Sequence, residues 1–495
     1  MQINHKLPAI VILCFLGVIS GSCKKLISIP IPEDTITTSQ VFSSEPQAES
    51  ALAGMYSRMI NGMTFTGMGS LATDIFSAGA VTIMAGLSSD ELYNIYSNTE
   101  EGFYVLNCNK LTSINSGVAN VLWITAYRTI YDANGIIEGV AASTSDALRD
   151  SARKQLTGEA KFVRAFCYFY LTNLYGDLPL ALTVDFNKTV NLRRASQQQV
   201  YQQIATDLKD AETLLVADYS TGKGERVRPN KWAATALLAR TYLFMGDTKN
   251  ASLAASAVIG HSVFFNLETD LNNVFRKDSR EAIWQLKQTI TDGTLKNATP
   301  EGSALLPVPL YHGTARFSIT NRLLDAFVPG DNRRADWVDS TDNADLSFGI
   351  TYYPAKYKTG NANGEVNVPA PEYYMMLRLA EMYLVRAEAD ANGGPGGLSA
   401  AITDLNTIRH RAGLTALPDD LTKVQVLAAI EKERQVELFA EWGHRWFDLK
   451  RTGRAHDVLS SVPIKQPWAG DYQLLYPIPN SEIRVNASLI QNPQY

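Results

Sequence analysis

The side chains that most often carry out chemistry do not fall into the spacings that a reaction needs. The chain has 495 residues with six histidines and four cysteines. The histidines show no metal-ligand spacing, and no Cys-x-x-Cys pair is present. A phosphate-binding P-loop and a nucleophile elbow are also absent from the sequence. We therefore predict that the protein is not an enzyme.

Carboxylates are numerous, for instance Asp90 and Glu91, or the cluster Asp339, Asp342 and Asp345. A catalytic carboxylate pair is defined by its separation in space, which the sequence does not give. The preferred interpretation of the cluster is a solvated acidic loop. A structural calcium ion is the remaining alternative, although no calcium-binding motif supports it. We expect no cofactor.

Aromatic residues beside polar ones are a better functional signal. They gather in two stretches without periodicity, residues 61–105 and 261–370, which we predict to be long loop regions. Loops on a rigid frame commonly carry binding function, and an aromatic ring that stacks on a ligand should be partly exposed. The candidate ligand-binding residues are Tyr93, Tyr96, Tyr104, Tyr311 and Trp337, with Tyr96 and Trp337 as the leading pair. Trp123 and Trp284 lie in patterned segments and are assigned to the core.

Helices must position these loops. Apolar residues recur with helical spacing over 121–140, 151–177, 196–217 and 230–245. The segment 151–177 is apolar on two sides, so it should be packed between neighbours. Residues 237–259 and 382–409 both read as an Ala-rich helix, a Gly turn and a second Ala-rich helix, as in tetratricopeptide repeats. The predicted fold is therefore predominantly α, a tetratricopeptide-like scaffold of helical hairpins with long irregular loops and a few short strands, one of them at 281–289.

The N-terminus has the pattern of a secretory signal. Lys6 precedes an apolar run from Ala9 to Ile19, which is shorter than the roughly 20 residues that a spanning helix needs. Small residues then lead to Cys23, which predicts a signal peptide over 1–22 and an acylated Cys23. A plain secreted protein remains the alternative. We expect a lipidated tether over 23–43, then regions 44–260 and 261–495 packed as one body.

The net charge and the two remaining cysteines support two further predictions, one on partners and one on disulfides. The net charge is −5 and no basic run is present, so nucleic acid is not an expected partner. Cys167 lies in the apolar segment FVRAFCYFYL, where a buried free thiol is the commoner state. A disulfide between Cys108 and Cys167 is the less favoured alternative.

The stretch EKERQVELFAEWGHRWFDLKRTGR, residues 431–454, is the most distinctive in the chain. Read as one helix, it places Glu441 four residues before Arg445 and Asp448 three residues before Arg451, which favours two ion pairs. We interpret these charges as scaffold rather than as catalytic groups.

These residues resemble the C-terminal signature of the SusD/RagB family of outer-membrane lipoproteins. The resemblance rests on Glu433-Arg434, Glu437-Leu438, Glu441, Arg445, Phe447-Asp448-Leu449, Arg451 and Gly453. It extends to the ending LYPIPNSEIRVNASLIQNPQY, to the central helix PEYYMMLRLAEMYLVRAEA and to the early helix GEAKFVRAFCYFYLTNLYGDLPL. The matching segments run from about Cys23 to Tyr495.

The resemblance implies a Bacteroidetes surface lipoprotein that is tied to the outer membrane by Cys23 and caps a SusC-like, TonB-dependent transporter. It also implies that the helical pairs form the scaffold and that the irregular regions shape the ligand site. An oligosaccharide is the favoured ligand, and peptides or another nutrient are the alternative. No feature of the sequence separates these two ligand classes.

Overall fold

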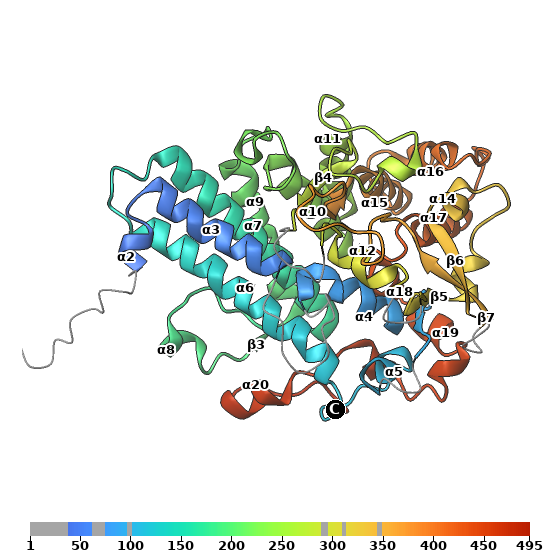
Figure 1. Cartoon of the computed structure of the whole chain (residues 1–495), viewed down its shortest axis with the longest axis horizontal. Helices are drawn as coiled ribbons and strands as arrows, with labels where there is room; N and C mark the ends of the chain where they lie inside the picture. The colour runs from blue at the N-terminus through green and yellow to red at the C-terminus, as the bar shows by residue number, and fades with distance from the viewer. Residues whose placement is uncertain (1–37, 62–74, 97–100, 289–295, 309–312, 344–348) are drawn as a thin grey trace, which may run out of the picture.

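The computed structural model describes residues 38–61, 75–96, 101–288, 296–308, 313–343 and 349–495 (Figure 1). The predicted signal peptide, Cys23 and most of the tether lie outside these residues, and so does Tyr311. Within the described ranges, no helix combines the length and the apolar character that crossing a bilayer requires.

Helices that pack one on the next form the scaffold (Figure 1). α3 lies on α6, α7 lies between α6 and α9, and α10, α11, α15, α16 and α17 extend the series. The bounds are α2 Thr38–Val41, α3 Glu45–Ile60, α6 Gly117–Ala142, α7 Asp150–Tyr175, α9 Gln197–Leu214, α10 Lys231–Phe244, α11 Thr248–Ile259, α15 Leu379–Ala391, α16 Gly397–Arg411, α17 Lys423–Glu437 and α18 His444–Arg451. The two predicted hairpins are α10–α11 and α15–α16, and the predominantly α architecture is confirmed.

Local sequence explains where these helices begin and how closely they pack. Capping boxes start α9 at Ser196 and α17 at Thr422, and each satisfies backbone N–H groups that the first helical turn leaves unpaired. α7 is buried on both sides, with Phe162 and Phe166 fully enclosed, as its two apolar faces predicted. At Gly158 a Cβ would lie 2.9 Å from the Leu215 side chain, so a larger residue there would force Leu215 to move.

The first irregular region is more regular than expected. It contains a π-helical turn η2 over Phe76–Ala80, α4 over Val81–Ser88, β1 over Leu92–Asn94 and α5 over Glu101–Asn107. The expectation of loop over 61–105 is therefore wrong for η2, α4 and α5, and every residue of α4 is buried. The small residues that suggested turns serve close packing instead, since a Cβ on Gly86 would lie 2.7 Å from Leu92.

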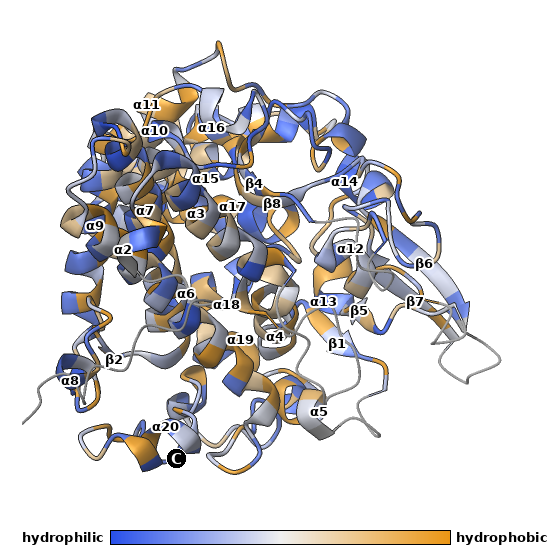
Figure 2. Ribbon diagram, turned by 60° about the vertical axis from the view of Figure 1, so that its left-hand side comes forward, coloured by the Kyte–Doolittle hydropathy of each residue, from blue (hydrophilic) through white to orange (hydrophobic). Residues whose placement is uncertain are grey.

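The second irregular region consists of short elements joined by long connections. β4, which covers Ala282–Leu286 and was predicted as a strand, pairs antiparallel with β8. A hairpin of β6 and β7 stands out from the helices at the edge of the molecule (Figure 2). The bounds are η4 Leu271–Asn273, α12 Pro300–Leu305, β5 Phe317–Ile319, α13 Asn321–Leu324, α14 Asn332–Asp336, β6 Val338–Asn343, β7 Gly349–Pro354 and β8 Tyr374–Arg378.

The remaining short elements lie between scaffold helices or follow α18. They are β2 Leu178–Pro179, α8 Phe186–Thr189, β3 Arg194–Ala195, η3 Ser220–Gly222, α19 Ala455–Leu459, η7 Pro463–Lys465, η8 Asp471–Leu474 and α20 Asn480–Val485. Cys108 and Cys167 are both free and buried, as expected. Trp123 and Trp284 lie in the core, which confirms their assignment.

Candidate ligand-binding site

The structure brings the two irregular regions together. β1 from the first region pairs antiparallel with β5 from the second, and Tyr93 lies opposite Ser318. Two further backbone hydrogen bonds extend the pairing. The Ile95 N–H donates to the Arg316 carbonyl at 3.1 Å, and the Thr320 N–H donates to the Glu91 carbonyl at 2.9 Å. Segments far apart in the sequence thus form one surface.

Three of the candidate aromatic residues lie on or beside this strand pair. Tyr93 and Tyr96 are partly exposed, and the Tyr96 hydroxyl is 3.1 Å from the Thr314 hydroxyl oxygen. Tyr104 is 41% exposed on α5, which packs against β1. Partial burial raises the pKa of Tyr93, while a hydrogen bond with Ser318 opposes the shift. Such exposed and fixed rings suit stacking on a ligand.

A hollow of about 270 Å³ opens beside Tyr93, and we call it the Tyr93 hollow. Its lining is Ser89, Asp90, Leu92, Tyr93, Asn107, Thr320, Asn321, Arg322, Val462, Pro463, Ile464 and Lys465. The buried Lys465 ammonium donates to the carbonyls of Leu87 and Asn107, each at 2.9 Å, and to Asn109 Oδ1 at 3.1 Å. Burial lowers the pKa of Lys465 to about 7.

A second hollow of about 570 Å³ lies along the β6–β7 hairpin, and we call it the Tyr353 hollow. Its lining is Leu306, Pro307, Ala335, Asp336, Val338, Asp339, Tyr353, Ala355, Tyr357, Lys358, Gly360, Ala362 and Asn363. The Tyr353 hydroxyl donates to Asp339 Oδ2 at 2.9 Å, and burial followed by this contact raises the Tyr353 pKa. β5 lies against β7, so both hollows belong to neighbouring strands.

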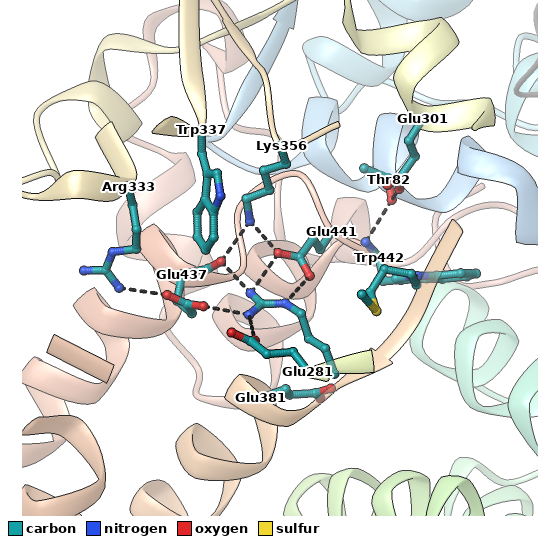
Figure 3. A network of polar contacts seen from close by, with 12 residues as sticks. Thr82, Glu281, Glu301, Arg333, Trp337, Lys356, Glu381, Glu437, Glu441 and Trp442 are labelled. Carbon is teal, nitrogen blue, oxygen red and sulfur yellow. Dashed lines mark hydrogen bonds and ion pairs between the residues drawn. The ribbon is translucent and has the colours of Figure 1, made fainter. Parts of the chain in front are cut away.

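Trp337 does not belong to this surface, and the expectation that it is a partly exposed stacking platform is wrong. Its indole is 0% exposed and donates from Nε1 to the Leu271 carbonyl at 3.0 Å. The Lys356 ammonium lies 4.7 Å from its ring centre (Figure 3). Two of the polar residues near it in the sequence, Asp331 and Arg333, are also buried, and Arg333 donates to both carboxylate oxygens of Asp331.

The charged residues of the C-terminal stretch form a buried network rather than a ligand surface (Figure 3). Arg378 is 2% exposed and donates to Glu437 at 2.6 Å and to Glu441 at 2.7 Å. Arg411 also contacts Glu437 and Glu281. Burial alone would raise the Glu437 pKa, but Arg411, Arg378 and Arg333 outweigh it and hold that pKa well below its ordinary value. The carboxylate is therefore ionised and fully paired.

The backbone breaks inside this stretch, so the predicted single helix is wrong. α17 ends at Glu437 and α18 begins at His444, and between them Ala440, Trp442 and Gly443 have φ of 50°, 50° and 68°. We call the segment from 438 to 443, together with the adjoining ends of α17 and α18, the α17–α18 corner. The break separates Glu441 from Arg445, and the expected ion pair between them does not form.

Each partner of that expected pair contacts an irregular region instead. Glu441 accepts from Lys356, which follows β7, and from Arg378. Arg445 donates to Asp90, which precedes β1. The expected pair between Asp448 and Arg451 is confirmed at 2.7 Å, and Arg434 also binds Asp448.

The five signature residues thus belong to the scaffold side of the molecule. Glu437, Glu441, Arg445, Asp448 and Arg451 all take part in ion pairs, and none of them lines either hollow. Through Asp90, Lys356 and Arg333, the α17–α18 corner and its neighbours connect to both irregular regions. These ion pairs connect the scaffold to the segments that flank the candidate aromatic residues.

Several residues of the surface were not singled out from the sequence. Asn363, Lys358, Arg322 and Lys465 line the hollows but stand in stretches without a motif. Asp339 does line the Tyr353 hollow, while Asp345 lies outside the described residues. Among the residues described, no three potential metal ligands come together.

Comparison with known proteins gives consistent matches over most of the chain. Residues 47–243 match the family model described as starch-binding associating with outer membrane, and residues 335–495 match the SusD family model. SusD-like protein P25 of Formosa agariphila is 25% identical over 540 aligned positions, which cover 98% of each chain.

Solved structures share the fold. A SusD superfamily protein from Bacteroides vulgatus has a TM-score of 0.76 at 21% identity, covering 92% of this chain and 100% of that one. Surface glycan-binding protein A from Bacteroides thetaiotaomicron, in complex with laminarihexaose, has a TM-score of 0.72 at 19% identity, covering 91% and 99%.

Proposed function

The chain belongs to the SusD/RagB family, and from that premise we propose that it is an outer-membrane nutrient-binding protein whose ligand is an oligosaccharide. The observation that carries the proposal is the β1–β5 surface, on which Tyr93 and Tyr96 are partly exposed, with Tyr93 lining one hollow and the Tyr353 hollow lying on the neighbouring strands. The laminarihexaose complex of a protein with the same fold supports the ligand class.

The chemistry of this surface suits sugars. Tyrosine rings stack on the apolar C–H faces of sugar rings, and a few placed polar groups fix the hydroxyls. In the Tyr353 hollow the exposed polar groups are Asp339, Lys358 and Asn363. Lys358 is held in place, since its ammonium donates to the carbonyls of Ala355 and Asp336. In this proposal the tyrosine rings and these polar groups bind and orient the ligand, and no catalytic step is involved.

The place of the protein in the cell follows from the N-terminal sequence and the family. In this proposal Cys23 is acylated and anchors the body to the outer membrane, with the protein at the cell surface as the lid of a SusC-like, TonB-dependent transporter. About three acyl chains, each methylene contributing about 0.8 kcal/mol, would make the anchor effectively permanent.

Binding is tested by calorimetry on purified protein with laminarihexaose, maltohexaose and a pool of hexapeptides. We expect binding of at least one oligosaccharide, recovery of that sugar unchanged, and weaker binding by Tyr93→Ala. Tyr131→Ala is the control, because Tyr131 is 59% exposed on α6 and lines neither hollow. Binding of peptides alone would replace the oligosaccharide in the proposal.

The anchor is tested separately in the native host. Cys23→Ala should leave the folded protein in the soluble fraction, whereas the native chain should sediment with outer membrane after a carbonate wash. A variant that still sediments would overturn the lipid anchor without affecting the ligand proposal.

A further inference from the structure

Arg445 links the scaffold to the strand that carries the candidate ligand residues. Its guanidinium forms a bidentate contact with the Asp90 carboxylate. Nε donates to Oδ1 at 2.8 Å and Nη2 donates to Oδ2 at 3.0 Å. The two residues are 355 positions apart in the sequence, and both are buried. Paired hydrogen bonds of this kind fix orientation as well as distance.

The scaffold holds Arg445 in place. α18 packs against α4, and Arg445 is its second residue after the left-handed turn at Gly443. A Cβ on Gly443 would lie 2.4 Å from Ala85, so the helix start lies directly on α4. Nη1 of Arg445 also donates to Glu431 of α17 at 3.2 Å. The guanidinium therefore has little freedom to move.

Asp90 in turn fixes the pairing of β1 with β5. Its carbonyl accepts from the Thr320 hydroxyl at 2.5 Å, and the next carbonyl, of Glu91, accepts from the Thr320 N–H. Tyr93 follows Asp90 by three residues and Tyr96 follows by six. Within the described part of the chain, the three-residue β1 pairs with β5 and with no other strand, and such a short two-stranded ladder is marginal without outside support.

We propose that Arg445, through its paired hydrogen bonds to Asp90, is the positioning residue that sets Tyr93 and Tyr96 on the ligand surface. The expected effect on ligand binding rests on the proposed function, whereas the effect on the pairing of β1 with β5 rests on the contacts alone. Other charged groups near the pair do not replace it. Glu431 and Glu91 are acidic, and the Lys465 ammonium is engaged by three other oxygen acceptors.

Arg451 provides a matched control on the same helix. Its guanidinium also binds two carboxylates, Glu388 at 2.7 Å and Asp448 at 2.7 Å, and its side chain is nearly as enclosed. Among the residues that the structure describes, Arg451 forms its hydrogen bonds and ion pairs with Glu388 and Asp448, which lie outside β1, β5 and their flanking residues. Arg445→Gln and Arg451→Gln should therefore both lower stability, while only the first should loosen β1.

The first measurement is native-state hydrogen exchange on the whole chain, read in peptides covering 90–96 and 314–320. We expect the Ile95 and Thr320 amides to exchange roughly tenfold faster or more in Arg445→Gln, with the amides of α10 unchanged. Arg451→Gln should leave both peptides at the native rate. Arg445→Lys, which keeps the charge but loses the bidentate contact, should give an intermediate rate.

The second measurement is calorimetry with laminarihexaose on the folded fraction. We expect roughly tenfold weaker binding for Arg445→Gln and native affinity for Arg451→Gln. If the native chain binds no oligosaccharide, the proposed function fails while the exchange experiment still tests the positioning role. If Arg445→Gln does not fold, Asp90→Asn, which keeps the volume of the carboxylate, replaces it in both measurements. Equal exchange of residues 90–96 in the Asp90, Arg445 and Arg451 variants would overturn the inference.

Discussion

The contact between α10 and α11 and the contact between the segment after β7 and the α17–α18 corner are made of different side chains. In the helical hairpin, alanines and leucines with no exposed surface recur on the two helices, among them Ala236, Leu237 and Ala255. At the corner, single charged groups make the connection, such as the Lys356 ammonium to Glu441. One interface repeats an apolar pattern, and the other depends on individual ion pairs.

The difference follows from the periodicity of the chain. A helix presents the same kind of face every turn, so small apolar residues can form a long interface. An irregular segment has no repeating face and must be fixed at a few points. Ion pairs with good geometry serve this purpose, but removing one partner leaves a buried charge uncompensated. The irregular regions should therefore be more sensitive to single polar substitutions than the hairpins.

The largest effect is expected at Arg378, which contacts Glu437, Glu441 and Glu281. Arg378→Met would leave these carboxylates without their central partner and should lower the free energy of unfolding by about 3–5 kcal/mol. Guanidinium denaturation measures the change. Arg409→Met is the control, because Arg409 is more exposed and its contact with Glu433 is 3.4 Å long. A decrease in the free energy of unfolding below about 1 kcal/mol would contradict a large contribution of this network to stability.

A truncation in the hairpin should cost somewhat less and act differently. Leu237→Ala removes a fully buried side chain of α10 and should lower stability by about 2–4 kcal/mol through the lost burial and the cavity left behind. Hydrogen exchange at residues 90–96 should stay at the native rate at a temperature where the variant is folded. Faster exchange there would mean that the two regions are not held independently.

A pH experiment separates paired from unpaired buried carboxyls. In the scaffold, Arg240 binds Glu381 with both oxygens engaged, and the Glu381 pKa is lowered to about 2. In the first irregular region, burial and the neighbouring Asp90 raise the Glu91 pKa to about 8 from an ordinary 4.5. The folded protein keeps this proton while the unfolded chain releases it, so the contribution of Glu91 to stability falls as pH rises from 4.5 to 8.

Glu91→Gln resembles the protonated side chain and should remove that slope. We expect native stability at pH 5 and a gain on the order of 2–4 kcal/mol over the native chain at pH 8. Denaturation curves at both values measure it. Glu45→Gln, on the exposed start of α3, should leave the slope between pH 5 and 8 unchanged. Equal pH profiles for the native chain and Glu91→Gln would show that Glu91 ionises normally.

A substitution at Trp337 tests whether this residue belongs to the core or to the ligand site. Trp337→Phe loses the hydrogen bond to Leu271 and part of a buried ring, which should lower stability by about 1–3 kcal/mol. Affinity for the oligosaccharide should not change in the folded fraction. Loss of binding at native stability would return Trp337 to the ligand site.

Tyr96 should behave in the opposite way. Tyr96→Ala is expected to weaken binding by about 1–2 kcal/mol through the lost ring face, with stability within about 0.5 kcal/mol of native. Tyr96→Phe keeps the ring and loses the contact with Thr314, so it should retain most of the affinity. Calorimetry and thermal melts on both variants check this. Native affinity in Tyr96→Ala would place the site elsewhere on the surface.

Much of the fold was accessible from the sequence because helical periodicity is local. α7, α9 and α10 and the hairpins α10–α11 and α15–α16 follow from spacing, caps and small residues. α4 was missed because Gly86 and its neighbours look like turn residues until Leu92 is seen to pack against them. The break after Glu437 was missed because its left-handed residues include Ala440 and Trp442, which rarely take such φ values.

The candidate site, like the fold, was predicted from the sequence only in part. Sequence indicated Tyr93, Tyr96 and Tyr104, because aromatic residues in non-periodic stretches are often exposed, and the same reasoning failed for Trp337. Exposure depends on what packs against a residue from elsewhere in the chain, and for Trp337 that includes Phe275, Phe439 and Lys356. Tyr311 stays a prediction.

The sequence by itself determined the helical class, the order of the scaffold helices, the signature residues and the resemblance to a family. Each of these depends on residues close together in the chain or on their types alone. Only the tertiary structure decided the partners of the signature charges, such as Asp90 for Arg445 and Lys356 for Glu441. It also decided the pairing of β1 with β5, because ion pairs and strand pairing between residues far apart in the chain leave no local pattern in a single sequence.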